Sequence, residues 1–403
     1  MSTGNRGGYN KKSVTDVDVK GKKVLLRCDF NVPLDKSTGV ITDEGRIIAA
    51  LPTINYLLEQ GAAVIACSHF GRPKGEFKPE FSLAPVAAAL SKHLGKPAKM
   101  AKDVIGSDAT TLAKELKPGE IMLIENTRFH KEEEKNDPEF AKKLASMADL
   151  FVSDAFGSVH RAHASTEGVS HYLPAVSGFL LKKELDNIGG AISQPKRPLV
   201  AILGGAKVSD KLGVINNLMK IADSIIIGGG MAYTFFKAQG GSIGNSLCED
   251  SEFENVLKML DEAKAKGVKL LLPVDSVAAP GFSNEGEPVT VDSNAIPDGK
   301  MALDIGPKAI KEFTDEIKGA GTIVWNGPMG VFEFSKYAEG TRSVATAVAN
   351  SNAISIIGGG DSAAAVRVFG LEDKITHIST GGGASLEFME GKVLPGIACL
   401  LDA

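Results

Sequence analysis

One unit recurs through the second half of the chain: a short apolar run, then glycine or a small polar residue, then a stretch compatible with a helix. The runs are "LVAILGG" (199–205), "SIIIGGG" (224–230), "KLLLPVD" (269–275), "TIVWNGP" (322–328), "AISIIGGG" (353–360) and "THISTGGG" (376–383). Each run is continuously apolar rather than alternating, which is typical of a strand covered on both faces. Segments 250–267 and 306–321 have the amphipathic pattern of crossover helices. This alternation predicts a mostly parallel sheet wound with helices.

The first half has a looser version of the same pattern. Its apolar runs are "KVLLRCDFN" (23–31), "AAVIACSHFGR" (62–72), "EIMLIENTRF" (120–129) and "DLFVSDAFG" (149–157). Between the halves, "NIGGAISQPKRPL" (187–199) carries glycines and two prolines, which is typical of a helix end and a linker. We therefore predict an α/β protein of two doubly wound, Rossmann-like domains with mostly parallel sheets: residues 1–187, a hinge at 188–199, and residues 200–390.

Composition restricts the classes of partner and location. With 43% hydrophobic and 23% charged residues the chain resembles an ordinary globular protein, and its net charge of -4 argues against broad binding of nucleic acid or acidic membranes. The four cysteines lie far apart without Cys-x-x-Cys, so they suggest neither zinc nor disulfides. No run approaches the ~18 apolar residues of a membrane helix, and the start "MSTGNRGGYN" lacks the apolar core of a signal peptide. We expect a cytoplasmic protein.

Charged and polar residues follow the predicted strands of the first half. Ligands of open α/β sheets bind beyond the carboxyl ends of the strands, and the planar guanidinium of arginine suits carboxylate and phosphate. A small, multiply charged anion is therefore the predicted ligand, and scattered surface arginines paired with carboxylates are the alternative. His160-x-x-His163 lacks a further ligand at a known spacing, which disfavours a metal site. The residues are Arg27, Asp29, Asn31, Arg46, His69, Arg72, Asn126, Arg128, Asp154, His160, Arg161 and His163.

Glycine loops follow the strands of the second half. Glycine lets phosphate approach the backbone, and a helix N-terminus favours negative charge. After Gly204 and Gly205, Lys207 and Lys211 are spaced to share one face of the predicted helix, although the order differs from a P-loop. In "GGGDS" (358–362), Asp361 is suited to hold Mg²⁺ beside phosphates. Each loop alone also fits a tight turn, but several in one sheet favour a nucleotide site.

Two other enzyme classes have partial motifs here. "GGGDSA" (358–363) matches the dinucleotide fingerprint of an NAD-dependent dehydrogenase, but the next strand ends in Ser379 and Thr380 instead of an acidic residue. "GGSIG" (240–244) matches the Gly-x-Ser-x-Gly of serine hydrolases, but it follows a helical pattern and not a strand. Both classes are disfavoured.

Eight ordered segments together resemble the phosphoglycerate kinase family, whose members exchange a phosphoryl group between 1,3-bisphosphoglycerate and ADP. They are "RCDFNVPL" (27–34), "SHFGRPKG" (68–75), "ENTRFH" (125–130), "DAFGSVHRAH" (154–163), "LGGAKVSDK" (203–211), "IIGGGMAYTF" (226–235), "WNGPMGVFE" (325–333) and "GGGDS" with "STGGGASLE" (358–362, 379–387). The resemblance implies a glycolytic kinase that is monomeric, closes by hinge bending and uses Mg²⁺ with ADP or ATP. A non-catalytic nucleotide-binding relative is expected to lack one of the charged residues, and none is missing.

The resemblance also implies roles for individual residues. Those expected to hold phosphoglycerate are Asp29, Asn31, Arg46, His69, Arg72, Arg128 and Arg161. Those expected at the nucleotide are Lys207, Lys211, Gly228, Gly229, Ala302, Asn326, Glu333 at the ribose, Gly359, Gly360, Asp361 as the Mg²⁺ ligand, and Ser362. Those expected to stabilise the moving phosphoryl group are Arg46, Lys207, Lys211, Gly381, Gly382 and Gly383.

The remaining expectations concern departures from the family and the end of the chain. Ser362 stands where the family usually has threonine, and Ala302 stands where it often has glycine. Neither change removes a charged group, so activity is expected to persist with a modest effect on nucleotide affinity. Cys28 is interpreted as a small buried apolar residue. The tail 391–403 is expected to return to the first domain.

Overall fold

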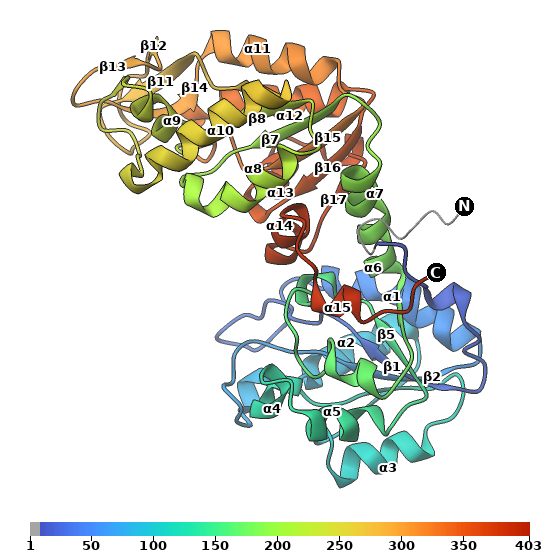
Figure 1. Ribbon diagram of the computed structural model, residues 1–403. Coiled ribbons are helices and arrows are strands. Elements are labelled where there is room, and N and C mark those ends of the chain that lie inside the picture. The colour runs from blue at the N-terminus through green and yellow to red at the C-terminus, as the bar shows by residue number, and fades with distance from the viewer. Residues whose placement is uncertain (1–8) are drawn as a thin grey trace, which may run out of the picture. The chain divides into compact units, whose positions relative to one another are not determined.

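The chain folds into two compact units, each built on its own parallel sheet. The computed structural model describes residues 9–403; residues 1–8, which include most of the polar start, lie outside it. The first unit contains the described residues up to Asp186 together with Val393–Ala403, and the second contains Asn187–Lys392. Figure 1 shows both units with most of their helices and strands labelled.

The sheet of the first unit has six strands in the order β3-β4-β2-β1-β5-β6, all parallel. Their bounds are β1 Lys23–Arg27, β2 Ala63–Cys67, β3 Ala98–Met100, β4 Ile121–Leu123, β5 Leu150–Ser153 and β6 Ala175–Ser177. Every residue of β2, β4, β5 and β6 is buried, which is the burial expected of a sheet covered on both faces. The chain leaves β1 toward β2 on one side and leaves β5 toward β6 on the other, so a topological switch point lies between β1 and β5.

Helices cover this first sheet. They are α1 Gly45–Glu59, α2 Ala84–Leu94, α3 Ser107–Glu115, α4 Lys131–Glu134, α5 Pro138–Ala145 and α6 Phe179–Glu184. On one face, α1 and α2 pack Ile54, Leu57 and Leu90 against Val24 and Val64 of the sheet. Helix α5 begins where the Asp137 carboxylate accepts a hydrogen bond from the backbone N–H of Phe140, with Pro138 at the first helical position.

The end of the chain packs within the first unit. Helix α15 (Pro395–Ala398) lies beside the loop after β5, because the backbone N–H of Gly396 donates to the carbonyl of Val159. Beyond it, Leu401 N–H donates to the carbonyl of Ala175 in β6, and Asp402 forms a bridge and an ion pair with Lys11. The first unit is therefore assembled from two distant parts of the sequence.

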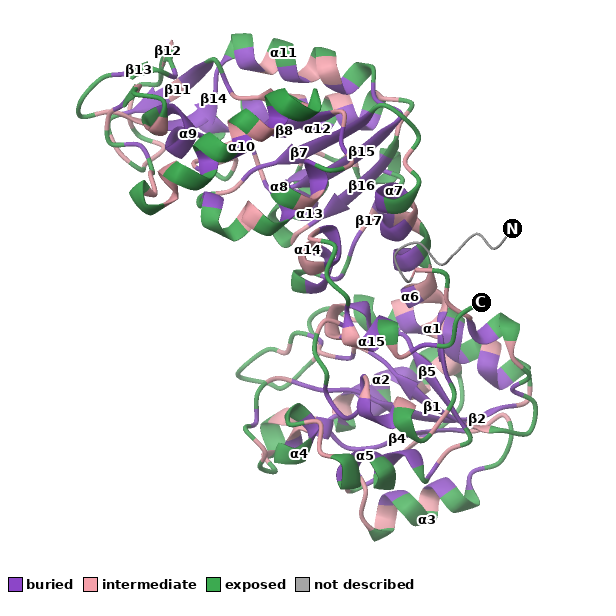
Figure 2. Cartoon of the chain, viewed as in Figure 1, coloured by how far each residue is buried: buried purple, intermediate pink, exposed green. Residues whose placement is uncertain are grey.

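The main sheet of the second unit also has six parallel strands, in the order β10-β8-β7-β15-β16-β17. Their bounds are β7 Leu199–Leu203, β8 Ser224–Ile227, β10 Lys269–Leu271, β15 Thr322–Asn326, β16 Ile354–Gly358 and β17 His377–Ile378. All six lie within the apolar runs predicted as strands. Figure 2 shows the central strands of both sheets as buried and the outward helix faces as exposed.

A second, smaller sheet was not predicted from the sequence. It is antiparallel, with the order β12-β11-β14, and it is accompanied by the short parallel pair β13-β9. The bounds are β9 Ser242–Ile243, β11 Asp275–Ala279, β12 Val289–Asp292, β13 Ala295–Ile296 and β14 Met301–Ile305. This sheet supplies one wall of the pocket described below.

The helices of the second unit are α7 Gly190–Ser193, α8 Leu212–Leu218, α9 Ala232–Ala238, α10 Phe253–Lys266, α11 Pro307–Lys318, α12 Glu339–Asn350, α13 Gly360–Val368 and α14 Gly383–Met389. Phe313 of α11 and Val344 of α12 pack against Ile202, Ile323 and Trp325 on one face of the main sheet. Along the chain between β6 and β7, a π-helix covers Leu185–Gly189, and α7 follows it directly.

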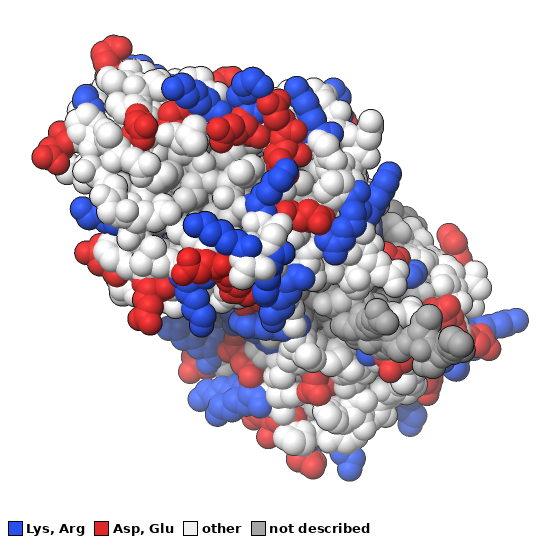
Figure 3. Space-filling model, turned by 45° about the horizontal axis from the view of Figure 1, so that its top comes forward, with Lys and Arg blue, Asp and Glu red and all other residues white. Residues whose placement is uncertain are grey.

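The surface is mixed in charge. On the face drawn in Figure 3, lysine and arginine side chains occur together with aspartate and glutamate across the whole view. None of the helices within residues 9–403 combines the length and the apolar character needed to span a bilayer.

Candidate active site

The loops after β1 and β2 are joined through Asp29 and Asn31. One carboxylate oxygen of Asp29 accepts hydrogen bonds from Arg46 Nη1 (3.1 Å) and from the backbone N–H of Asn31 (3.1 Å). Arg46 also donates to the carbonyl of Asn31 (2.8 Å), while the side-chain oxygen of Asn31 accepts from Gly71 N–H (3.0 Å). The first turn of α1 is thereby fixed to the carboxyl ends of β1 and β2.

His69 lies among cations directly after β2. Its Nδ1 is 3.0 Å from an amino nitrogen of Arg27, and the ring is 8% exposed. Burial, followed by the charges of Arg27, Arg128, Arg46 and His163, places the pKa of His69 well below its ordinary value of 6.5. The imidazole is therefore neutral at neutral pH and lies in a positive electrostatic field.

Arg128 and Arg161 extend this positive region. Arg128 donates to the carbonyl of Gly71 (3.0 Å) and pairs with Glu134 at 3.6 Å. Burial lowers the pKa of Arg128; Glu134 opposes this shift, whereas Arg27 and Arg161 add to it. Arg161 is exposed and donates to Nε2 of His160 (3.2 Å). Like charges ~5 Å apart at an effective dielectric of ~20 repel by about 3 kcal/mol. A bound anion would offset this repulsion.

Arg72 stands apart from that set. It lies exposed in the loop after β2 and makes no hydrogen bond or ion pair within residues 9–403. Of the seven residues expected at phosphoglycerate, the structure thus links Asp29, Asn31 and Arg46 by hydrogen bonds, and His69, Arg46, Arg128 and Arg161 by their charges.

Asp154, at the end of β5, has an internal role. It is 2% exposed, and one of its oxygens accepts the backbone N–H groups of Leu180 (2.9 Å) and Leu181 (3.3 Å) in the first turn of α6. Its Oδ2 has no hydrogen-bond partner within the described residues. Burial raises the pKa of Asp154 to about 7.

In the second unit, the switch point lies between β7 and β15, and glycine is required there. A Cβ on Gly204 would lie 2.0 Å from the carbonyl oxygen of Pro328. Gly205 has φ of +130°, a conformation that residues with a side chain rarely adopt. In the neighbouring strand β15, Trp325 is fully buried and its Nε1–H donates to the carbonyl of Gly327 (2.7 Å).

The structure corrects the predicted placement of Lys207 and Lys211 on one helical face. Lys207 is extended (φ -122°, ψ 127°) and precedes a 3-10 turn at Val208–Lys211, after which α8 begins at Leu212. Lys207 is exposed, whereas Lys211 donates to the side-chain oxygen of Asn326. Burial lowers the pKa of Lys211, while Asp210 and Asp361 oppose that shift. Gly205, with φ of +130°, and the extended Lys207 thus lie between the end of β7 at Leu203 and the first helical turn.

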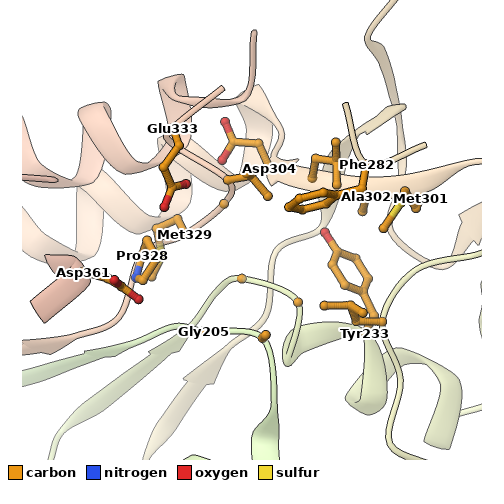
Figure 4. A pocket seen from close by; sticks show the side chains of 17 residues that line it. Gly205, Tyr233, Phe282, Met301, Ala302, Asp304, Pro328, Met329, Glu333 and Asp361 are labelled. Carbon is orange, nitrogen blue, oxygen red and sulfur yellow. The ribbon is translucent and has the colours of Figure 1, made fainter. Parts of the chain in front are cut away.

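A pocket of about 430 Å³ opens beside this turn. Figure 4 shows Tyr233, Phe282, Met301 and Ala302 at one end of the pocket, and Glu333 and Asp361 at the other. The pocket is thus an apolar slot that leads to two carboxylates, with Gly205 between them. Its volume is in the range of small-molecule sites, and a flat, apolar ring with a charged extension matches its two ends.

Asp304 forms part of the pocket wall. It is 3% exposed, and its carboxylate accepts the backbone N–H of Gly340 at the start of α12 (2.8 Å) and that of Ile305 (2.9 Å). Burial raises the pKa of Asp304 to about 7. The residue thus joins β14 to the start of α12.

Several of the expected glycines do not line the pocket, namely Gly228, Gly359, Gly360, Gly381, Gly382 and Gly383. Gly228 packs against Met329, and Gly359, with φ of +90°, packs against the amide of Asn326. Gly360 and Asp361 begin α13. Gly383 begins α14 after its N-cap Gly382, and Gly381 N–H donates to the Ser379 hydroxyl (3.2 Å). Of the expected nucleotide set, Gly229, Ala302, Glu333 and Asp361 line the pocket itself.

Ser362 is fully buried, so its hydroxyl serves the fold. It accepts from Gly327 N–H (2.7 Å) and donates to the carbonyl of Gly358 (3.1 Å). The serine thus ties the loop after β15 to the end of β16. Its contribution to nucleotide binding would be indirect.

Sequence reasoning missed several pocket residues. Tyr233, Leu247, Phe282, Met301, Leu303, Asp304 and Val331 line the pocket but were not expected there. Most come from α9 or from the small antiparallel sheet and its loops. One feature of the sequence could have indicated a pocket residue: Phe282 is a large apolar side chain in a segment rich in glycine and proline, "PGFSNEGEP".

The donors for a metal ion are sparse. Within the described residues no group of three or more histidine, cysteine, aspartate or glutamate side chains is placed to hold one. Asp361 is exposed at the end of the pocket and makes no ion pair within residues 9–403. One free carboxylate fits Mg²⁺, which keeps several waters and is usually bound through one or two carboxylates together with substrate phosphates.

Comparisons of the sequence with a family profile and with known proteins agree on one family. The sequence profile of the family described as "Phosphoglycerate kinase" matches residues 14–392. Phosphoglycerate kinase of Clostridium botulinum is 59% identical over 397 residues, which covers 98% of this chain and 99% of that protein. Phosphoglycerate kinase of Clostridium novyi is 59% identical over 396 residues, with the same coverage.

Solved structures agree in fold. The phosphoglycerate kinase of Coxiella burnetii superposes with a TM-score of 0.92 at 44% identity, covering 96% of this chain and 98% of that one. That of Pyrococcus horikoshii OT3 gives a TM-score of 0.78 at 34% identity with the same coverage. The predicted α/β fold with mostly parallel sheets is confirmed.

Proposed function

Because the chain belongs to the phosphoglycerate kinase family, we propose that its first unit holds the phosphoglycerate and its second unit holds the nucleotide. The family's reaction is the glycolytic, reversible transfer of a phosphoryl group between 1,3-bisphosphoglycerate and ADP, which gives 3-phosphoglycerate and ATP. The observation that carries the division of labour is the pocket of the second unit, which leads from Phe282 and Ala302 to Asp361.

For the acid, the proposed ligands are Asp29, Asn31, Arg46, His69, Arg72, Arg128 and Arg161. The concentration of positive charge around His69 supports this assignment, because the substrate carries both a carboxylate and a phosphate. Asp29 would act mainly by aligning Arg46, to which it is bonded at 3.1 Å.

For the nucleotide, the base would enter the apolar slot beside Ala302, with Gly228 and Gly229 behind it, and the ribose would lie at Glu333. The phosphates would then point toward the turn at Gly205, where Lys207, Lys211 and Asn326 are available. Gly359, Gly360 and Ser362 would shape the loop that presents Asp361. Helix α13 starts at this loop, and a helix N-terminus favours negative charge.

We propose Asp361 as the Mg²⁺ ligand. When bound, Mg²⁺ would neutralise phosphate charge during transfer. The exposed, unpaired state of the Asp361 carboxylate supports this role.

Charge stabilisation and positioning would carry the catalysis. The acceptor in the ATP-consuming direction is a carboxylate, which is ionised at neutral pH, so the reaction needs no general base. Arg46, Lys207 and Lys211, with backbone N–H groups of Gly381, Gly382 and Gly383, would stabilise the transferring phosphoryl group.

The proposed domains are residues 1–187 with the tail 391–403, and residues 200–390, joined by a hinge at 188–199. Since the two substrates are assigned to different units, transfer requires the units to close about that hinge. A monomer acting in the cytoplasm, with no nucleic-acid or membrane partner, fits the family.

The direct test is the ATP-consuming reaction with 3-phosphoglycerate, coupled to NADH oxidation. We expect turnover that requires both ATP and Mg²⁺. An active protein whose Asp361→Ala variant keeps the wild-type dependence on Mg²⁺ would contradict the assignment of Asp361, and lack of turnover with Mg²⁺ present would contradict the function itself.

A further inference from the structure

Behind the proposed acid site, a chain of hydrogen bonds runs through the interior of the first unit from Glu133 to His69. The carboxylate of Glu133 accepts from the backbone N–H (2.7 Å) and the hydroxyl (2.6 Å) of Ser165. The hydroxyl oxygen of Ser165 accepts from Arg27 Nε (2.8 Å), and Arg27 Nη2 is 3.0 Å from His69 Nδ1. All four residues are at most 8% exposed.

The direction of each bond follows from the chemistry of the groups. A guanidinium can only donate, so Nδ1 of His69 must be the acceptor. A neutral imidazole with an unprotonated Nδ1 carries its proton on Nε2. The single hydrogen of the Ser165 hydroxyl points to Glu133, which leaves its oxygen free to accept from Arg27. Each donor therefore has one acceptor.

The charges along this series of hydrogen-bonded residues oppose protonation of His69. The buried cation Arg27 is balanced by the buried carboxylate of Glu133 at the far end. An imidazolium at His69 would add a second cation 3.0 Å from Arg27 without a further anion. Arg46, Arg128 and His163 also face the ring, and burial together with these charges holds the pKa of His69 well below 6.5.

We propose that Arg27 is a positioning residue that holds His69 as the neutral Nε2–H tautomer, so that the ring donates a hydrogen bond to the bound acid. The proposal rests on the proposed role of His69 in binding phosphoglycerate. In this arrangement His69 contributes a hydrogen-bond donor in a fixed position, whereas the arginines of the site contribute the positive charge that attracts the acid. Glu133 and Ser165 maintain the arrangement by holding Arg27 from the opposite side.

The tautomer is measurable in the free protein. In long-range ¹H–¹⁵N correlation spectra of the ¹⁵N-labelled full chain, with His69 assigned by its loss in His69→Gln, we expect the Nε2–H pattern unchanged from pH 6 to pH 8. An Nδ1–H pattern, or an imidazolium at pH 6.5, would overturn the proposal. This readout does not depend on substrate, and it does not require that variants of Arg27 or Glu133 fold.

The positioning role is tested by Arg27→Met combined with Glu133→Gln, which removes both buried charges together. We expect His69 to show mixed tautomers, and KM for 3-phosphoglycerate to rise about tenfold with KM for ATP unchanged, as for one lost hydrogen bond. The matched control, Lys99→Met with Glu120→Gln, neutralises an ion pair of the same unit outside the site and should leave both KM values unchanged.

A folded double variant with wild-type KM for 3-phosphoglycerate and an unchanged tautomer would overturn the positioning role. If the proposed acid site itself were wrong, a different result would be seen. If His69→Gln kept the wild-type KM for 3-phosphoglycerate, the proposed acid site would be wrong, while the wild-type spectrum would still decide the tautomer.

Discussion

The backbones of Gly204 and Gly327 cross so closely that a Cβ on Gly327 would lie 2.1 Å from the carbonyl oxygen of Gly204. Gly204 follows β7 and Gly327 follows β15, which are neighbouring strands. The chain leaves β7 toward β8 and leaves β15 toward β16, on opposite sides of this pair. The crossing brings the loop of Lys207 next to the loop of Pro328 and Met329. It therefore sets the position of the pocket wall to which Gly205, Pro328 and Met329 contribute.

Gly204→Ala should destabilise the second unit and widen this crossing. The new methyl group would meet backbone atoms that cannot rotate away, so we expect a loss of roughly 1–3 kcal/mol in the free energy of unfolding and a higher KM for ADP. Urea denaturation and steady-state kinetics measure both. Gly319→Ala is the control, because it lies exposed at the end of α11 and a Cβ there would contact nothing closer than 3.9 Å. If the two variants had equal free energies of unfolding, the close contact of the two backbones at Gly204 would be contradicted.

Lys207→Ala should lower kcat by on the order of 100-fold or more, as for loss of one donor that acts in the transition state. Stability should change little, because Lys207 is exposed. The coupled assay gives kcat, and Lys258→Ala on the exposed side of α10 is the control. Near-normal turnover would remove Lys207 from the mechanism.

Arg46→Ala should lower kcat by roughly 10-fold to 100-fold with little effect on KM for ADP. The reason is that Arg46 is held by Asp29 and Asn31 in the first unit, whereas the pocket belongs to the second. Kinetics with each substrate varied separately measure the effect. Arg367→Ala, which breaks an exposed pair with Glu372, serves as the control. A parallel loss of ADP binding would show that Arg46 serves the nucleotide instead.

Asp154 should make the stability of the first unit depend on pH. Its pKa is about 7 when folded, against about 3.9 in an unfolded chain. The folded state thus retains a proton between these values, so stability is fully present below pH ~4 and falls as the pH rises to ~7, by roughly 4 kcal/mol at most.

Asp154→Asn removes this ionisation. Relative to the wild type, the variant should gain stability steadily between pH 4.5 and 7.5, as measured by urea denaturation at several pH values. Asp18→Asn changes an exposed aspartate of the same unit and should show no such trend. A constant difference between wild type and Asp154→Asn would mean that Asp154 is ionised throughout that range.

Much of the fold could be predicted because buried parallel strands have a distinct sequence pattern. Strands such as β7 and β16 are continuous apolar runs that end in glycine, and both lie where the sequence placed them. The antiparallel sheet could not be found in this way. Strand β12 is largely exposed and short, so it has neither a continuous apolar run nor a clear alternation.

The sites were harder to predict than the fold. The spacing of Lys207 and Lys211 suggested one helical face, but Lys207 is extended and precedes the first helical turn. Arg27 was counted among the strand-end residues, yet its partner Ser165 is 138 residues away. No local pattern can disclose such a pairing, because only the folded sheet brings the two together.

Trp325 gives the protein a built-in optical reporter. It is the only tryptophan of the chain, and its indole N–H is bonded to the carbonyl of Gly327, one residue before the pocket wall at Pro328. Indole emission responds to changes in such a hydrogen bond and to nearby polar groups. Intrinsic fluorescence should therefore follow occupation of the pocket in the unmodified protein, without an attached dye.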